Sequence, residues 1–147
     1  MGFARRVVLD TSTLIGAILK PRSVPAQALN LATEHAEILV SEESLAELAL
    51  VVQRSQLDRY RSPVERETFY RIYAEAALLI AVTKPVTACR DPKDDKFLSV
   101  AVAGGASLIV SSDLDLLSMQ QFGVIPILSA RAFVELCQNP LPQATSE

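Results

Sequence analysis

Short apolar runs alternate with longer amphipathic stretches along this chain, and polar residues, Gly or Pro separate them. The short runs are rich in Val, Ile and Leu, which is typical of buried strands, whereas the longer stretches carry apolar residues at helical spacing. This pattern predicts strands at residues 6–9, 37–40, 78–82, 107–110 and 124–128. Pro126 lies inside the last run, which favours a position at the edge of the sheet.

Helix starts are marked by a capping side chain in front of an apolar stretch. Such caps predict helices that begin after Ser23, Ser41, Ser62 and Ser129. Further helices are predicted at residues 14–19, at residues 114–122 and, beginning at Asp94 or Asp95, up to the glycine pair 104–105. Ser44 stands where a capping box after Ser41 would have Glu or Gln, so we expect that box to be imperfect.

The alternation of strands and helices defines the expected fold class. It implies an α/β protein with a central parallel sheet and helices on both faces, which makes three layers, α/β/α. The length of 147 residues suits one domain. We expect this domain to occupy residues 1–138, and we expect the polar, proline-containing tail at residues 139–147 to be disordered.

Composition and residue types exclude several classes of function. No uncharged apolar stretch approaches the roughly 20 residues that span a bilayer, and the first apolar run stops at Asp10, too early for a signal peptide. We therefore expect a cytoplasmic protein with no membrane partner. Cys89 and Cys137 lack the spacing of a zinc site, and His35 is the only histidine. We expect both thiols to be unpaired and His35 to be exposed.

Carboxylates stand where the predicted strands and helices meet. Asp10 and Asp113 follow two of the clearest strands, and Asp94 and Asp95 open the helix before the second of them. Ligands collect beyond the carboxyl ends of strands in an open parallel sheet, so we expect these groups at one edge. Any one of the aspartates can equally be a helix cap. Glu47 lies beside the apolar stripe of its helix and is either a further member of this group of carboxylates or an ordinary solvated residue.

Several carboxylates in one cleft raise one another's pKa unless a positive charge lies among them. A hard cation meets this need, and oxygen ligands with retained waters suit Mg²⁺ or Mn²⁺. Such a site can activate a water for attack on a phosphodiester. The acidic residues therefore predict a divalent-metal site, formed without His or Cys.

The ordered set of acidic motifs resembles that of the PIN-domain ribonucleases, closest to the VapC-like branch of toxin components of toxin–antitoxin systems. The resemblance covers roughly residues 5 to 135 and is fairly specific because the motifs occur in the family's order. It rests on the segments 7–12, 41–48, 90–98 and 109–117, with the small-residue segment 103–106 between the last two.

The resemblance implies a metal-dependent endoribonuclease that cleaves single-stranded RNA. Asp10, Glu47, Asp113 and one of the pair Asp94 and Asp95 would then bind the metal and be catalytic. We favour Asp94 because it shares a helix face with apolar residues that pack on the sheet, although the order can be reversed. Residues expected to support the site from outside are Asp95, Ser111, Ser12 and Thr11.

The resemblance also implies partners for the protein. The family usually dimerises and is inhibited by a small antitoxin protein, so we expect a homodimer and an antitoxin. Asp115 is expected to start a helix rather than to bind metal. The net charge of −3 does not by itself indicate nucleic-acid binding. Basic side chains that would contact the RNA backbone, or else form solvated helix faces, are Arg59, Arg61, Lys93 and Lys96.

Two other functions fit the sequence less well. A doubly wound phosphatase or phosphotransfer domain would use Asp10 as nucleophile, but its usual motif has a second Asp where this chain has Ser12. A catalytically weak or inert PIN-type module that binds RNA or protein is the main alternative, and it is disfavoured because all four acidic positions are filled. Asp10→Asn separates the two cases, since it should abolish cleavage in a nuclease and leave binding almost unchanged.

Overall fold

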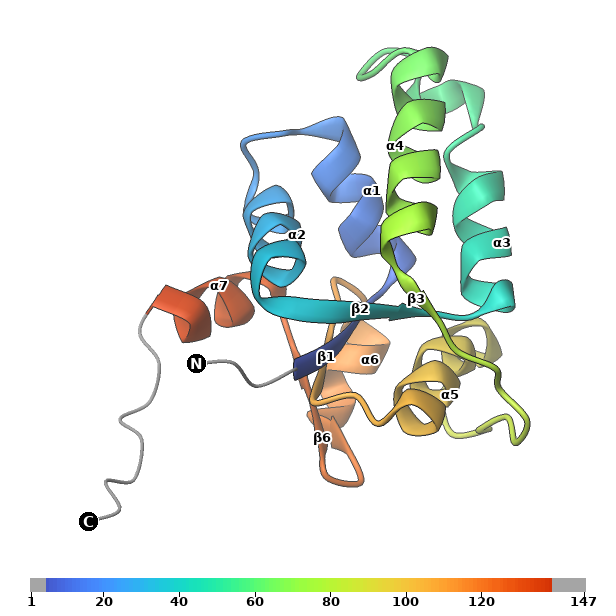
Figure 1. Ribbon diagram of the computed structural model, residues 1–147, viewed down its shortest axis with the longest axis vertical. Helices are drawn as coiled ribbons and strands as arrows, with labels where there is room; N and C mark the ends of the chain where they lie inside the picture. Colours follow the sequence, from blue (N-terminus) through green and yellow to red (C-terminus); the bar gives the residue numbers. More distant parts are fainter. Residues whose placement is uncertain (1–4, 139–147) are drawn as a thin grey trace.

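A computed structural model describes residues 5–138 of the chain (Figure 1). Its six-stranded sheet has the order β3-β2-β1-β4-β6-β5. The strands are β1 (Arg5–Leu9), β2 (Ala36–Val40), β3 (Leu78–Leu79), β4 (Leu108–Val110), β5 (Gln121–Phe122) and β6 (Ile125–Leu128). The helices are α1 (Thr11–Leu19), α2 (Val24–His35), α3 (Glu42–Val51), α4 (Pro63–Ala76), α5 (Asp95–Gly104), α6 (Leu114–Met119) and α7 (Ala130–Gln138). The tail expected at residues 139–147 lies outside the described residues.

The sheet is parallel except for its last pair, in which β5 runs antiparallel to β6. β1 lies at the centre, where Val7 pairs with Ile38 of β2 on one side and with Leu108 of β4 on the other. Alternate residues of β1 face opposite layers, because successive side chains in a strand point to opposite faces. Val7 and Leu9 belong to one hydrophobic cluster, and Val8 belongs to the other.

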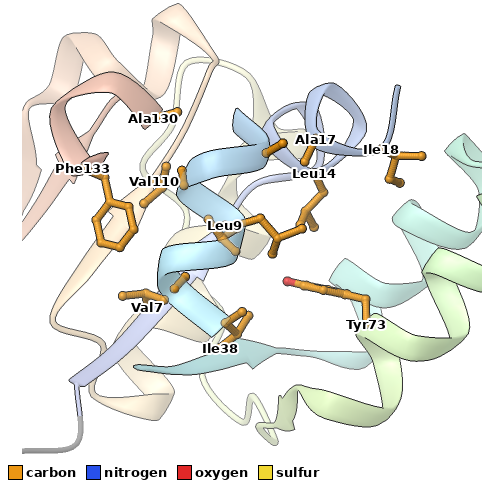
Figure 2. Packing of buried hydrophobic residues seen from close by; sticks show 14 of the residues in the cluster. Val7, Leu9, Leu14, Ala17, Ile18, Ile38, Tyr73, Val110, Ala130 and Phe133 are labelled. Atoms are coloured by element: carbon orange, nitrogen blue, oxygen red, sulfur yellow. The ribbon is translucent and has the colours of Figure 1, made fainter. Parts of the chain in front are cut away.

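The two hydrophobic clusters lie between the sheet and the helices that cover its two faces, as expected of a three-layer α/β/α fold. On one face, α1, α2, α7 and residues of α3 and α4 cover the sheet, with Phe133 and Tyr73 entering the cluster from opposite sides (Figure 2). On the other face lie α5 and α6 (Figure 1). Burying both faces explains why the strand sequences are almost continuously apolar. The predicted fold class is confirmed.

Local sequence signals fix where the helices begin. The Ser62 hydroxyl accepts a hydrogen bond from the Glu65 amide, and the Glu65 carboxylate accepts one from the Ser62 amide, as the predicted capping box requires. The expectation for α3 was wrong. Ser44 completes that box, because its hydroxyl accepts from the Ser41 amide at 2.9 Å while Ser41 Oγ accepts from the Ser44 amide. A serine hydroxyl therefore serves here in place of Glu or Gln.

The sheet differs from the sequence prediction near its ends. β6 is not an edge strand, because β4 pairs with one side of it and the two-residue β5 with the other. Pro126 lies opposite Gln121 of β5. α6 ends at Met119 rather than at residue 122, since Gln120 has a positive φ of 66°, which cannot continue the helix. β3 is likewise limited to Leu78–Leu79 instead of continuing to residue 82.

Helix α5 approaches the sheet closely at its C-terminal end. A Cβ atom on Gly104 would lie 2.6 Å from Cδ1 of Leu39 in β2, so any side chain at this position would force Leu39 to move. Gly105 then ends the helix in a left-handed conformation at φ 65°. Both glycines help to set how α5 lies on the sheet, and α5 begins next to the carboxylates described below.

Cysteine and histidine lie as the sequence predicted. Cys89 and Cys137 are both free thiols, one in a loop and one in α7. His35 is exposed at the end of α2. Across residues 5–138, the helices are all too short or too polar to cross a membrane.

Candidate metal centre

The candidate site lies where the strand order of the sheet reverses, between β1 and β4. In open α/β sheets, the carboxyl ends of the strands at this point form the usual ligand crevice. Asp10 follows β1 and Asp113 follows β4 by three residues. The amide of Asp10 donates to the Val110 carbonyl at 3.1 Å, which ties the two strand ends together.

Asp10 is buried and accepts hydrogen bonds on both carboxylate oxygens. Oδ1 accepts from the Thr13 amide at 2.9 Å and from the Ser12 hydroxyl at 3.2 Å. Oδ2 accepts from the Ser111 hydroxyl at 2.5 Å and from the Ser112 amide at 3.3 Å. Asp10 is therefore the cap of α1 and links it to the loop after β4. Ser12 and Ser111, expected from the sequence to support the site, both contact this carboxylate.

Asp94 is the carboxylate whose charge is least compensated. It lies in a short 3-10 turn, Pro92–Asp94, and only 8% of its surface is exposed. Its Oδ2 atom is buried without a hydrogen-bond partner. Burial, followed by the negative charges of Asp113, Asp91 and Asp10, raises the pKa of Asp94 to about 6. An uncompensated oxygen of this kind is the feature that a cation would satisfy.

Two further aspartates bring their carboxylates next to that of Asp94. Asp94, Asp113 and Asp115 each offer an oxygen, and these three atoms lie within 4.8 Å of one another. Asp113 caps α6 by accepting a hydrogen bond from the Asp115 amide at 2.7 Å. Asp115 does stand at the helix start, as expected, but its side chain also joins the acidic group. The sequence signal for this role was that Asp113 and Asp115 follow a strand and are separated by a single residue.

Glu47 of α3 has a different environment from the aspartates. Its Oε1 atom accepts a hydrogen bond from the Thr11 hydroxyl at 2.5 Å, and its Oε2 atom accepts one from Lys96 Nζ at 3.2 Å. Lys96 is buried, with 8% of its side chain exposed, and it also donates to the Lys93 carbonyl. The charge of Glu47 is thus paired with a cation from the first turn of α5.

Asp95 has different partners from its neighbour Asp94 and does not belong to this acidic group. Its Oδ1 atom accepts hydrogen bonds from the amides of Ala88 and Cys89, at 3.0 and 2.7 Å. These backbone hydrogen bonds lower the pKa of the Asp95 carboxyl. The structure therefore places Asp94 in the acidic group, whereas Asp95 holds the loop that precedes it.

The acidic residues line an open cleft of about 420 Å³. Among its lining residues, the basic side chains are Arg54 and Lys93. Of the residues predicted to contact RNA, only Lys93 lies here. Arg59 is stacked over Tyr60, and Arg61 is paired with Glu65. Acidic residues that line the cleft are Asp10, Glu47, Asp91, Asp94 and Asp113.

Two basic side chains are buried although their sequence context indicates an exposed position. Lys96, expected to face the RNA backbone, is buried and paired with Glu47. Arg66 follows Arg59 and Arg61 closely in the sequence but is only 1% exposed, with its guanidinium donating to backbone carbonyls and to Asp58. Both are long side chains whose partners come from other parts of the chain, so their burial was not visible as a local pattern.

The donor set fits a hard divalent cation. The closely grouped ligand atoms are carboxylate oxygens, one of them buried and unpartnered. Mg²⁺ and Mn²⁺ prefer such oxygens and keep several water ligands, for which an open cleft leaves room. Zn²⁺ is a poorer fit because no His or Cys takes part in this group.

Fold and site together define a three-layer α/β domain with an acidic cleft at the carboxyl edge of its sheet. The model of one family, the PIN domain, matches residues 6–115, a span that includes the described acidic residues from Asp10 to Asp115. The chain therefore belongs to the PIN-domain family.

Individual proteins are similar to this chain in sequence or in fold. An uncharacterized protein of Methanocaldococcus jannaschii is 27% identical over 117 residues, which cover 78% of this chain and 75% of the relative. A crystal structure of VapBC2 from Rickettsia felis bound to a promoter DNA fragment matches with a TM-score of 0.60 and 17% identity, covering 84% of this chain and 98% of that one. DNA-bound VapBC from Salmonella typhimurium matches with a TM-score of 0.59 and 17% identity, covering 86% and 98%. These two likenesses establish the same fold.

Proposed function

We propose that this protein is a metal-dependent endoribonuclease that cleaves phosphodiester bonds in single-stranded RNA. The observation that carries the proposal is the buried, unpartnered Oδ2 atom of Asp94, which lines an open cleft together with Asp113 and lies close to the carboxylate of Asp115. Membership of the PIN-domain family supports a nuclease.

The carboxylates would hold Mg²⁺ or Mn²⁺ at Asp94, Asp113 and Asp115, with Asp10 beside them. A bound ion would supply an activated water and would neutralise negative charge on the phosphate. Asp10 links the start of α1 to the loop after β4, because its carboxylate accepts hydrogen bonds from Thr13 and from Ser111. Ser111 contributes to the same arrangement, since its hydroxyl donates to Asp10 Oδ2 and accepts from the Asp113 amide.

Arg54 and Lys93 are the basic side chains that would bind the RNA backbone, because they line the same cleft as the carboxylates. Each phosphate contact that is lost should reduce the slope of log affinity against log salt by about 0.7 for a single strand. We expect Arg54→Gln and Lys93→Gln each to weaken RNA binding and to lower this slope. Binding is measured by fluorescence anisotropy at several salt concentrations, with Ca²⁺ in place of Mn²⁺ to prevent cleavage.

Arg71→Gln is the matched control for these two variants. Arg71 is an exposed arginine of α4 that does not line the acidic cleft. It should leave both affinity and salt slope unchanged. Equal losses in all three variants would mean that RNA binds through overall charge and not in the cleft.

The biological role we propose is that of the toxin in a toxin–antitoxin pair. The structural likeness to VapBC complexes supports a small antitoxin partner for this chain. A homodimer and a cytoplasmic location complete the proposal, because both are usual for such toxins. Co-expression with the neighbouring gene product, followed by size-exclusion chromatography, tests the partner and the dimer together.

RNA cleavage is the direct test of the proposed activity. The purified protein is incubated with a labelled single-stranded RNA and Mn²⁺, and parallel reactions contain EDTA or the variant Asp113→Asn. Asn is as good a helix cap as Asp, so this variant removes the charge of Asp113 and keeps the start of α6. We expect cleavage with Mn²⁺ alone, and loss of cleavage with EDTA or in the variant.

The same experiment separates the enzyme from the alternative function. A catalytically inert module would bind RNA in the anisotropy assay and leave it intact with every metal. Cleavage that continues in EDTA would show a contaminating or metal-independent nuclease, and would contradict the proposal.

A further inference from the structure

Glu47 and the aspartates of the cleft differ in how their charges are balanced. Both Glu47 oxygens accept hydrogen bonds, from Thr11 and from Lys96, and the Lys96 contact is a partly buried ion pair. Asp94 has a buried oxygen with no partner and lies beside two further carboxylates. A cation therefore gains most at Asp94, whose buried Oδ2 atom accepts no hydrogen bond.

Lys96 is held in place by more than its ion pair. Lysine is almost never buried without a partner, and here the ammonium also donates to the Lys93 carbonyl and lies 5.3 Å from the centre of the Phe97 ring. Since Lys96 is in the first turn of α5, it is carried by the same rigid element that follows Asp94. Its charge is a fixed part of the site.

We infer that Glu47 stays outside the inner coordination sphere of the metal, because Lys96 and Thr11 hold its carboxylate. The cation then binds on the aspartate side of the cleft, at Asp94, Asp113 and Asp115. The Lys96 ammonium occupies the position beside Glu47 that a second metal ion would need, so each chain binds one divalent ion. This inference rests on the proposed metal site and departs from the four-carboxylate ligand set that the sequence implied.

The arrangement of the ligand atoms is consistent with this division. Within residues 5–138, the oxygens of Asp94, Asp113 and Asp115 come within 4.8 Å of one another, and no such group includes Glu47. A second divalent ion at Glu47 would lie next to the Lys96 ammonium, which is 3.2 Å from Oε2. Like charges at such a separation repel strongly in a partly buried site.

Titration with Mn²⁺ tests the inference without RNA. The free ion is followed by its electron paramagnetic resonance signal, which gives both stoichiometry and Kd for the purified, EDTA-treated chain. We expect one Mn²⁺ per chain for the native sequence. We expect Glu47→Gln to change Kd by less than about threefold, because Thr11 and Lys96 already hold its carboxylate. Asp94→Asn or Asp115→Asn should raise Kd by more than the roughly 10–100-fold that loss of an outer-shell contact costs.

Lys96 variants extend the same titration. Lys96→Met removes the charge beside Glu47 and should allow a second Mn²⁺ to bind, whereas Lys96→Arg keeps the charge and should keep one ion per chain. Circular dichroism and melting in EDTA verify that each variant is folded. If Lys96→Met does not fold, the Glu47→Gln result still decides.

The inference would be overturned by two Mn²⁺ ions bound to the native chain, or by a loss of affinity in Glu47→Gln as large as that in Asp94→Asn. Absence of any Mn²⁺ binding would overturn it too, together with the metal site of the proposed function. If the chain cleaves RNA but its Mn²⁺ affinity depends on Glu47, the proposed ribonuclease activity is retained and only this inference is rejected. One ion bound at the aspartates without RNA cleavage would support the inference and remove only the ribonuclease.

Discussion

Replacing Asp94 by Asn is expected to stabilise the metal-free protein while it abolishes cleavage of RNA. The native carboxylate is buried, and its Oδ2 atom has no hydrogen-bond partner. Asn is nearly isosteric and uncharged, so it loses no hydrogen bond at Oδ2 and avoids repulsion by Asp113, Asp91 and Asp10. We expect a gain of about 1–2 kcal/mol in the free energy of unfolding at pH 7.5 in EDTA.

The gain should depend on pH in a defined direction. The pKa of Asp94 is raised from 3.8 to about 6 in the folded protein, so between these values the folded state binds more protons than the unfolded state. Native stability relative to the variant therefore falls as the pH rises through this window, and the full difference is present above about pH 7. Below about pH 4 the two proteins should be equally stable. Urea unfolding at a series of pH values measures this difference.

Manganese should reverse the order of stability. At 100 times its Kd, a ligand that binds only the folded state adds about 2.7 kcal/mol. The native chain should gain this amount and the Asp94→Asn variant much less. RNA cleavage should fall by more than the roughly 10–100-fold that loss of an outer-shell contact costs.

Asp95→Asn is the matched control, because it removes the charge of a neighbouring aspartate whose ionised form stabilises the folded protein. The Asp95 carboxylate accepts hydrogen bonds from two backbone amides, which lower its pKa. Its contribution to stability is present above the ordinary carboxyl pKa and is lost as the pH falls. This variant should therefore be less stable than the native chain at pH 7.5. A destabilised Asp94→Asn variant in EDTA would show that Asp94 has a partner in solution, contrary to the structure.

The parts of the fold that could be predicted from sequence are those set by local signals. A serine followed by an apolar stretch fixes a helix start within a few residues, as at Ser23, Ser41 and Ser62. Strand identity follows from continuous apolar runs. The two-residue strand β5 has no such signal, because it exists through its pairing with β6. Pro126 was misinterpreted for the same reason, since β5 covers the side of β6 that the sequence left open.

The candidate site was predictable as far as it depends on strand ends. Parallel strands bring Asp10 and Asp113 to the same edge whatever the details of packing, and the structure places them there. The choice between Asp94 and Asp95 needed three-dimensional information, because both stand at the start of one helix. Their roles separate only through the loop amides that bind Asp95.

Long basic side chains were the main failure of sequence reasoning. Lys96 and its partner Glu47 are 49 residues apart, so no local spacing relates them. Arg66 stands close to other arginines in the sequence, but helix α4 turns it inward to the carbonyl groups of the α3–α4 connection. Charge in the sequence indicates an exposed surface only when no buried acceptor group lies within reach of the side chain.

Replacing Arg66 by Met is expected to destabilise the protein by about 3–5 kcal/mol. The guanidinium is buried and donates to the carbonyls of Val52 at 2.7 Å and Arg54 at 3.3 Å, and also to the carbonyl of Arg61. It also forms a 2.8 Å ion pair with Asp58. Methionine fills part of the volume but leaves these carbonyls without their donor, and unsatisfied buried groups are costly.

Asp58→Asn is the control that separates the ion pair from the carbonyl contacts. Asp58 is about half exposed, at 51% of its side chain, so losing its charge should cost no more than about 1 kcal/mol. Urea unfolding at pH 7.5 in EDTA compares the two variants with the native chain. Equal losses in both would assign the stability to the ion pair and contradict the role of the carbonyl groups.

The effect of Arg66→Met should reach the cleft as well. The segment that Arg66 holds includes Arg54, whose side chain lines the cleft and whose carbonyl accepts from the Arg66 guanidinium. Loosening this segment should weaken RNA binding in the anisotropy assay under conditions where the variant is still folded. Mn²⁺ affinity should change little, because the carboxylates that bind the ion belong to other elements. Parallel losses of RNA and metal binding would instead indicate general unfolding of the variant.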